Sequence, residues 1–325
     1  MVTIRDVARD AGVSLTTASR VARGEDSVTE HTKVRVLQSI HRLGYQPNQA
    51  AQQLRTRRSQ VIGIVVSDLE NIFYTQVIAR LEGVLKKKGY SFMLSFTAED
   101  AQEELASIGM MLGARIGAML ITPVRRDDDL GRSLLTKSNI PTLQLYRNVY
   151  TELNSLVMDD MYGIQQATHK LLEAGHRKIL LLDVLWEGRA AGYRMAHKEV
   201  GLAADEGFIQ TYHLNTYEEK KISQDILRLS PTAIVAGTNL LGHSAITACR
   251  MLGKRIPEDV SMIIQDDVPW VGLLEITAIR QPMDIIADTI AQWVETHAST
   301  TGKYAEWHGA IQPEIIDRRS VRPLG

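Results

Sequence analysis

The stretch TIRDVARDAGVSLTTASRV, residues 3–21, decides the fold of the N-terminal part of the chain. Thr3 stands three residues before Asp6, the capping-box pattern that opens an α-helix. The apolar residues of the stretch recur at helical spacing, at Ile4, Val7, Ala8 and Ala11. Gly12 follows them, and because glycine tolerates positive φ, this first short helix is expected to end there in a tight turn.

A second helix is predicted directly after this turn. Ser14 can cap it, and the pattern continues from Leu15 to about Ala22. The small residues Ala8 and Ala18 allow the two helices to approach closely. Two helices joined by a tight turn form the helix-turn-helix arrangement, whose second helix reads DNA in the major groove. The residues at the start of the second helix that can reach base edges or phosphates are Leu15, Thr16, Thr17 and Arg20.

A third helix is predicted between Thr29, its cap, and Gly44, which follows its end. Its expected apolar face consists of Val34, Leu37, Ile40 and Leu43. Residues 45–48, Tyr-Gln-Pro-Asn, interrupt the helix, and a last short helical stretch precedes the basic linker at residues 55–58. The first 60 residues therefore form an all-helical head, since they contain no convincing strand pattern.

Charge is distributed unevenly along the chain. Residues 1–60 hold ten basic and five acidic side chains, a net charge of +5, whereas the remainder carries −6 within a total of −1. A basic head on an acidic body suits a nucleic-acid contact at one end only. The charge distribution alone does not exclude an asymmetry that arose by chance.

The composition is that of a soluble globular protein with two or three domains, at 325 residues, 44% hydrophobic and 23% charged. The sequence has no run of about 18 apolar residues, so no membrane span or membrane partner is expected. The N-terminus lacks the apolar region of a secretory signal. Cys249 is the single cysteine, which excludes intrachain disulfides, and the expected compartment is the cytoplasm.

After residue 60, short apolar runs alternate with amphipathic stretches. The expected strands lie within residues 61–66, 90–96, 117–122, 141–146, 155–159, 178–184, 231–237 and 260–265. Expected helices between them include residues 74–88, 100–114, 161–174, 240–252 and 283–298. Apolar strands alternating with helices indicate parallel sheets covered on both faces. Because one sheet of this length would be large, we expect two doubly wound lobes with a ligand between them, at the carboxyl ends of the strands.

Residues 3–21 and the segment VTEHTKVRVLQSIHRLGYQPNQAAQQL, residues 28–54, share an ordered set of motifs: D-V-A-x-x-A-G-V-S, S-R and G-Y-x-P-N. On these motifs the chain closely resembles the LacI/GalR family of bacterial transcription regulators, and the resemblance continues more weakly almost to the C-terminus. It implies a helix-turn-helix DNA-binding domain at 1–47, a hinge helix and linker at 48–59, and a periplasmic-binding-protein-like body for effector binding and dimerisation at 60–325.

The resemblance assigns DNA-binding roles position by position. Leu15 and Thr16 match the main base-reading positions, and Thr17, Ser19 and Arg20 match residues that contact bases or phosphate. In the hinge, Asn48 matches the asparagine that opens the helix, and Ala51 and Leu54 match the small residue and the leucine placed in the minor groove. The remaining candidates are Thr3 and Arg23. Arg23 departs from the family, which usually has asparagine there, and could add a phosphate contact.

The resemblance also implies an effector site in the body. Asp159-Asp160 stands where the family has Asp-Asn, Arg189 begins the R-x-x-G-Y-R motif, whose arginine commonly binds effector, and Asp266 begins the family's aspartate pair. Gln281-Pro282 is expected to close the last crossover between the lobes. The departures also lie at this site: Gly237-Thr238-Asn239 replaces Ala-Asn-Asp, and Ile264-Gln265 replaces a glycine and an aromatic. The resemblance therefore does not predict which residues of this chain would bind a sugar.

The candidate effector-binding residues are Phe73, Tyr74, Asp160, Arg189, Asp266 and Trp270. Phe73 and Tyr74 follow the strand at 61–66, where aromatic rings can stack on a sugar or a base, or pack in the core. An arginine at this site can hold hydroxyls, a carboxylate or a phosphate, but it can equally form a surface salt bridge. Asp266 can instead cap a helix, and Trp270 can serve packing alone.

An enzyme is the rival class, and its motifs are missing. The sequence contains neither G-x-S-x-G nor a phosphate loop nor G-x-G-x-x-G, and its nine histidines form no H-x-x-x-H pair. No catalytic residue, cofactor or metal site is therefore expected. A secreted solute-binding protein is a second rival, opposed by the basic head. The function that the sequence favours is a homodimeric repressor of a near-palindromic operator, controlled by a sugar-like effector; a corepressor-dependent or non-sugar-sensing regulator remains the alternative.

Overall fold

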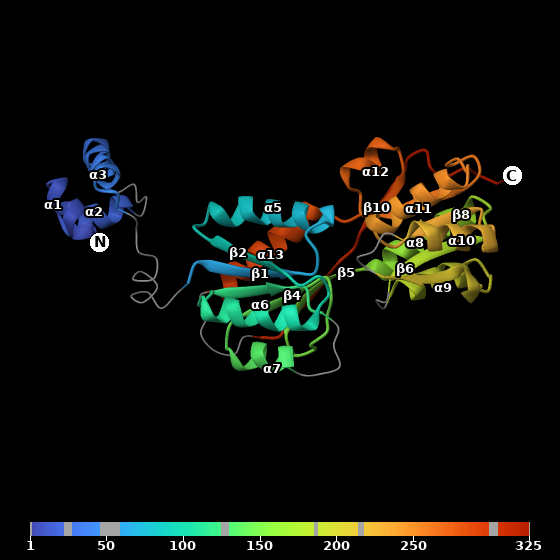
Figure 1. The fold of residues 1–325 in the computed structure, drawn as a ribbon, viewed down its shortest axis with the longest axis horizontal. Helices are drawn as coiled ribbons and strands as arrows, with labels where there is room; N and C mark the ends of the chain where they lie inside the picture. The colour runs from blue at the N-terminus through green and yellow to red at the C-terminus, as the bar shows by residue number, and fades with distance from the viewer. Residues whose placement is uncertain are drawn as a thin grey trace. The chain divides into compact units, whose positions relative to one another are not determined.

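The computed structural model describes residues 2–22, 28–45, 59–124, 130–184, 188–213, 218–298 and 305–324. The chain divides into two compact units, Met1–Arg58 and Ser59–Gly325 (Figure 1). The predicted hinge at 48–59 lies outside the described residues except for Ser59. Within the described part, no helix is both long and apolar enough to cross a membrane.

The first unit is a small helical head. Its described helices are α1 (Ile4–Asp10), α2 (Leu15–Ala22) and α3 (Glu30–Leu43). The Asp6 carboxylate accepts hydrogen bonds from the backbone N–H and the hydroxyl of Thr3, at 2.9 and 2.6 Å. The Ser14 hydroxyl accepts from the Thr17 N–H at 3.1 Å, which caps α2 as predicted. Gly12 and Gly44 both have positive φ, +61° and +62°, so the predicted helix ends are confirmed.

The head has a core of small and β-branched residues: Val7, Ala8, Ala11, Ala18, Val21 and Val36. The predicted apolar face of α3 is wrong in part, because Val34 and Leu37 are 43% and 47% exposed whereas Val36 is fully buried. Residues three apart on a helix drift by about 60° per step, so a run of such steps cannot stay on one face. The buried face follows mixed steps of three and four, through Val36, Ile40 and Leu43.

Polar contacts from α3 fix the turn between α1 and α2. The Arg35 guanidinium donates to the carbonyl oxygens of Ala11 and Gly12. A Cβ at Gly12 would lie 2.9 Å from Arg35 Nη2, the end of a flexible side chain that can shift, so the positive φ is the main reason for glycine at this position. Ser39 and Arg42 both donate to the Asp10 carboxylate at the end of α1.

The second unit consists of two lobes, each built on a twisted sheet. In the first lobe the described strands are paired in the order β11-β5-β4-β3-β1-β2, and all these pairs are parallel. They are β1 (Val61–Val66), β2 (Ser91–Phe96), β3 (Ala118–Ile121), β4 (Thr142–Leu145), β5 (Asn154–Met158) and β11 (His308–Ile311). The helices are α5 (Ile72–Lys86), α6 (Ala101–Gly113), α7 (Leu130–Lys137) and α13 (Met283–His297).

The second lobe repeats this plan, with described strands in the order β12-β10-β9-β8-β6-β7. They are β6 (Ile179–Val184), β7 (Ile209–Tyr212), β8 (Ala233–Ala236), β9 (Ser261–Gln265), β10 (Thr277–Arg280) and β12 (Glu314–Ile316), of which only β12 is antiparallel to its neighbour. The helices are α8 (Asp160–Glu173), α9 (Arg189–Glu199), α10 (Glu219–Leu229), α11 (Asn239–Met251) and α12 (Pro269–Leu273), with a short 3₁₀ turn at Glu206–Phe208.

Each sheet is buried on both faces. In the first lobe, α5 and α13 cover one face and α6 and α7 cover the other (Figure 1). In the second lobe, α8 and α9 cover one face, and α10, α11 and α12 cover the other. This double covering explains why β1, β6 and β8 are continuous apolar runs, and it confirms the predicted fold of two doubly wound lobes.

The chain passes between the two lobes three times. The crossovers lie between β5 and α8, between β10 and α13, and between β11 and β12. The expectation that Gln281-Pro282 closes the last crossover is wrong, because β11 returns to the first sheet and Gln312-Pro313 then leads to β12 in the second. The short, late strands β11 and β12 carry no apolar run long enough to reveal this third passage in the sequence.

Substitution of Gly192 tests the packing of α9 on α8. A Cβ at Gly192 would lie 2.1 Å from the backbone oxygen of Met161, so the two helices would have to separate. We expect Gly192→Ala to lower the free energy of unfolding by about 1–3 kcal/mol or more, measured by urea denaturation. Gly109→Ala is the matched control: nothing lies within 4 Å of its added Cβ on α6, so the substitution should be neutral or stabilising. Equal effects of the two substitutions would contradict this packing.

Candidate functional site

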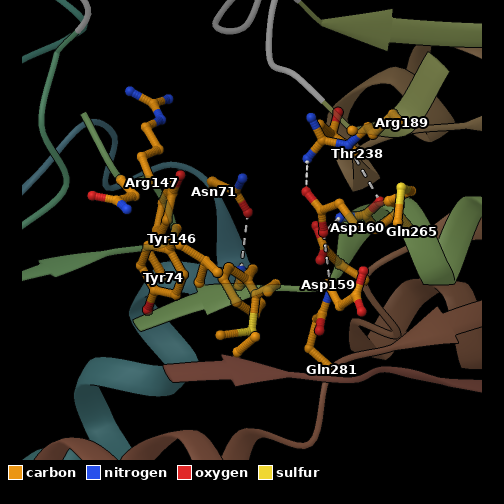
Figure 2. Close-up of a pocket in the computed structure, with 18 of the residues that line it drawn as sticks. Asn71, Tyr74, Tyr146, Arg147, Asp159, Asp160, Arg189, Thr238, Gln265 and Gln281 are labelled. Carbon is orange, nitrogen blue, oxygen red and sulfur yellow. Dashed lines mark hydrogen bonds and ion pairs between the residues drawn. The ribbon is translucent and has the colours of Figure 1, made fainter. Parts of the chain in front are cut away.

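A cavity of about 760 Å³ lies between the two lobes, at the carboxyl ends of their parallel strands. Figure 2 shows Tyr74, Tyr146 and Arg147 of the first lobe facing Asp160, Arg189 and Gln265 of the second across this space. The cavity is also lined by Val157 and Met158 of β5, by Ala310 of β11 and by Gln281 of the crossover between β10 and α13. A volume of this size is typical of small-molecule sites.

The first lobe supplies an aromatic wall. Asn71 caps α5, since its side-chain oxygen accepts from the Phe73 N–H at 3.0 Å, and this brings Phe73 and Tyr74 into the first turn. Tyr146 follows β4 and packs against both rings, with centroids 5.2 Å from Phe73 and 5.1 Å from Tyr74. Burial raises the pKa of Tyr74 and of Tyr146, so both phenols keep their protons at neutral pH.

The second lobe supplies a charged and amide-rich cluster. Arg189 begins α9 and Asp160 begins α8, and their side chains form an ion pair with Nη2 and Oδ2 2.6 Å apart. Gln265 bridges the pair: its Nε2 donates to Asp160 Oδ1 at 2.8 Å, and its Oε1 accepts from Arg189 Nε at 3.4 Å. Gln281 also donates to Asp160 Oδ1, at 3.4 Å. Arg189 is only 8% exposed, and its Nη1 has no hydrogen-bond partner among the described residues.

Asp266 lies beside this cluster in an unusual backbone conformation. It follows β9 with φ of +72°, a value that favours glycine and asparagine, and it is 6% exposed. Tyr146 has the same feature after β4, with φ of +67°, so β4 and β9 occupy equivalent places in their sheets and each ends in a turned residue that lines the cavity. Burial raises the pKa of the Asp266 carboxyl to about 6, despite a hydrogen bond from Asn239 at 2.9 Å.

Asn239 joins the two lobes. It begins α11, is 2% exposed, and its amide nitrogen donates both to Asp266 and to Asn71 of the first lobe, each at 2.9 Å. The cross-lobe contact therefore involves the same carboxylate that lines the cavity and the same asparagine that caps α5.

The structure brings together five of the six residues predicted for the effector site: Phe73, Tyr74, Asp160, Arg189 and Asp266. Trp270 does not line this cavity; it packs on the core of the second lobe, with its ring 6.1 Å from that of His243. Asp266 does not cap α12, whose N-cap is Val268, and Arg189 forms a buried ion pair rather than a surface one.

Sequence reasoning missed several lining residues. They are Asn71, Tyr146, Arg147, Asp159, Thr238, Gln265 and Gln281. Position could have indicated Tyr146 and Arg147, because Tyr146 ends the strand expected within residues 141–146 and Arg147 directly follows it, just as Phe73 and Tyr74 follow another strand at a short distance. Gln265 and Thr238 were noted only as departures from the family, although Gln265 holds the ion pair at the centre of the site.

In the head, the structure places the DNA-binding candidates on two helix starts. Leu15, Thr16 and Arg20 are exposed on α2, whereas Thr17 and Ser19 are half-buried. The Thr17 hydroxyl lies 2.8 Å from that of Ser14, within the cap of the helix. Thr3 is exposed at the start of α1 and its side chain is bonded to Asp6. The candidates Arg23, Asn48, Ala51 and Leu54 lie outside the described residues.

A helix-turn-helix head followed by a two-lobed body with a cavity at the strand ends defines a DNA-binding regulator of the periplasmic-binding-protein-like class. Family models agree: residues 3–48 match bacterial regulatory proteins of the lacI family, and residues 59–306 match periplasmic binding proteins and the sugar binding domain of the LacI family. The chain belongs to the lacI family of bacterial regulatory proteins, as its sequence motifs predicted, and is a DNA-binding transcription regulator.

The chain matches named transcription regulators over nearly their whole length. The chain is 31% identical to the transcriptional regulator CelR of Thermobifida fusca, covering 89% of this chain and 90% of CelR. It is 28% identical to the transcriptional repressor PurR of Pectobacterium carotovorum subsp. carotovorum (strain PC1), covering 99% and 97%. Among solved structures, a CelR–cellobiose complex matches with a TM-score of 0.72 at 25% identity, covering 98% of this chain and 100% of that one. The lac repressor dimer bound to operator and the anti-inducer ONPF shares the fold, with a TM-score of 0.80 at 23% identity and 99% coverage of both chains.

Substitution of Asp266 tests the electrostatics of the cavity. The folded pKa of about 6 lies above the unfolded value, so ionisation of this buried carboxyl costs stability as pH rises from about 4 to 6, and the cost is complete above pH 6. We therefore expect Asp266→Asn to raise the free energy of unfolding by about 1–3 kcal/mol at pH 7.5 and to change it little at pH 4. Asparagine keeps an oxygen for Asn239 and tolerates the positive φ. The measurement is urea denaturation at the two pH values.

Asp259→Asn is the control for this prediction. Arg255 donates to the Asp259 carboxylate and lowers its pKa, so this exposed carboxylate stabilises the fold above its pKa and the amide should not increase stability at pH 7.5. A loss of stability in Asp266→Asn at pH 7.5 would contradict a costly buried carboxylate.

Proposed function

We propose that the protein is a homodimeric repressor that binds a near-palindromic operator, and that a small effector bound between the two lobes changes its operator affinity. One observation carries the proposal: a chain that begins with a helix-turn-helix head also holds a cavity lined by both lobes of its body. Such a protein acts where the chromosome is, which in bacteria is the cytoplasm.

The exposed start of α2 supports a role in base reading. Leu15 and Thr16 stand on the first turn of the helix, with Arg20 one turn further on. The first residues of a recognition helix reach base edges, and arginine can bond guanine through both of its terminal nitrogens. The side chains of Thr17, Ser19 and Thr3 would contact the sugar-phosphate backbone of the DNA, and Arg23 would add a phosphate contact.

A homodimer would read two half-sites about 10 base pairs apart. The body offers apolar surface for a second copy: Leu94 and Phe96 are 43% and 55% exposed on β2, an edge strand of the first sheet. An exposed apolar edge strand is a liability unless a partner covers it. We assign to the hinge segment, with Asn48, Ala51 and Leu54, a short helix that pairs with its twin in the minor groove, where Leu54 acts as a wedge.

A sugar or sugar derivative is the proposed effector. An aromatic wall facing a cluster of carboxylates, amides and an arginine suits a ring with several hydroxyl groups. The relative CelR has been solved with cellobiose, which supports a ligand of this kind. Gln265 stands where relatives often carry an aromatic residue, and this keeps the alternative open that the ligand is not a sugar or that it acts as a corepressor.

Thr16→Ala tests the reading face. An operator is first selected from random DNA with the intact protein, and binding is then measured by fluorescence anisotropy at one fixed salt concentration. We expect a loss of about 1–3 kcal/mol on the operator and almost none on random DNA, because a base contact carries sequence information. Arg9→Ala removes an exposed cation on α1 and is the contrasting control: any loss should be equal on operator and random DNA, because a charge of the head attracts all DNA alike. Equal losses on operator and random DNA would exclude base reading by Thr16.

Arg189→Ala tests the effector site. We expect it to weaken binding of a ligand found by a thermal-stability screen of sugars, sugar acids and phosphates by about thirty-fold or more, and to abolish the ligand's effect on operator binding. Operator affinity without ligand should be kept. Arg194→Ala is the control on the same helix, where Arg194 pairs with Glu206 at the surface. A response that survives in Arg189→Ala would remove this residue from the effector site.

A further inference from the structure

Carboxylates outnumber cations at the second-lobe side of the cavity. Asp160, at the start of α8, and Asp266, directly after β9, line the cavity within electrostatic range of Arg189. Asp183 on β6 lies behind this lining, within electrostatic range of both Arg189 and Arg194. Burial raises the pKa of Asp183 to about 6, as it does for Asp266. In the lining itself, one guanidinium therefore faces the carboxyl groups of Asp160 and Asp266, and this cluster is net negative whenever both are ionised.

The other cation in the lining does not change this balance. Arg147 is 7% exposed and forms a two-point ion pair with Glu99, at 2.9 and 2.6 Å, and a hydrogen bond to the Pro123 carbonyl at 3.0 Å. Asp159 adds a further carboxylate to the lining, where it caps α8. Both arginines that line the cavity are thus neutralised by acidic partners.

Two polar groups of the cavity are placed to contact a ligand. Arg189 is buried, and its Nη1 has no hydrogen-bond acceptor among the described residues, so it can donate to an acceptor on a ligand. Asp266 offers a group of the opposite charge: its described donors, the side-chain amide and the backbone N–H of Asn239, are both uncharged, so a positively charged donor on a ligand would be attracted to this carboxylate. Tyr74 and Tyr146 stand near enough to Asp266 to interact with its charge, and aromatic faces attract cations.

We propose that the ligand of this cavity is a hydroxylated ring that carries an ammonium group, of the amino-sugar class. The ammonium lies between the Asp266 carboxylate and the aromatic wall, and a ring hydroxyl accepts from Arg189 Nη1. Carboxylated and phosphorylated rings are excluded, because Asp160 and Gln265 already hold Arg189 and a second anion would meet an excess of negative charge. This inference rests on the proposed effector role of the cavity.

The test compares rings that differ in one group. D-glucosamine, D-glucose, D-glucuronate and D-glucose 6-phosphate form one series, and D-galactosamine with the matching galactose compounds forms a second. Binding to the full-length protein is measured by calorimetry at pH 7.5. We expect the amine of at least one series to bind about tenfold or more tightly than its neutral counterpart, with no binding of the anions. The preference should disappear in Asp266→Asn and persist in Asp259→Asn.

Three results would overturn the proposal: tighter binding of a neutral or anionic ring, an amine preference that persists in Asp266→Asn, or no binding of either amine. The proposed function is tested separately, by operator affinity in the presence of each compound. If a neutral or anionic ring changes operator affinity at a lower concentration than the matching amine does, the amine class is wrong but the effector role stands. If amines bind the cavity and operator affinity never changes, the effector role fails while the ligand class stands.

Discussion

The body depends on one constraint: the chain crosses between two sheets three times, at strands that are neighbours within each sheet. β5 pairs with β11 and β10 pairs with β12, so all three passages leave and enter at the same edge. Since nearly all the paired strands are parallel, their carboxyl ends point to one side in each lobe, and the crossovers turn those two sides toward a common cavity. Helix starts and the turns that follow the strands then bring side chains into it.

The parts of this fold that the sequence revealed are those with a single physical cause. The strand at Val61–Val66 was predicted with its observed bounds, because burial on both faces demands a continuous apolar run. The three head helices followed from caps and glycines. Four strands, β7, β10, β11 and β12, were not recognised, because these short segments contain polar or charged residues and do not extend into an apolar run. The equally short β3 and β8 were predicted because they are wholly apolar. The face of α3 was misjudged where helical period was approximated as three.

The residues of the site also divide into those that the sequence indicated and those that it did not. Asp160, Arg189 and Asp266 could be named in advance because a family motif marks each of them, and the structure places all three in one lining. Tyr146 and Gln265 could not be ranked, because their importance comes from geometry: a positive φ that turns one ring onto two others, and an amide placed between both members of an ion pair. Pairing across 105 residues, as between Gln265 and Asp160, leaves no local pattern.

The amide of Asn239 connects the cavity with the separation of the lobes. It has two hydrogen atoms, and it gives one to Asp266 within its own lobe and one to Asn71 in the other. A positive charge beside Asp266 would draw the carboxylate away from this amide, whereas protonation would weaken the carboxylate as an acceptor. In either case the hold on Asn71 changes as well, and Asn71 caps the helix that carries the aromatic wall. A ligand bound at Asp266 would thus be linked to the position of the first lobe through one buried side chain, that of Asn239.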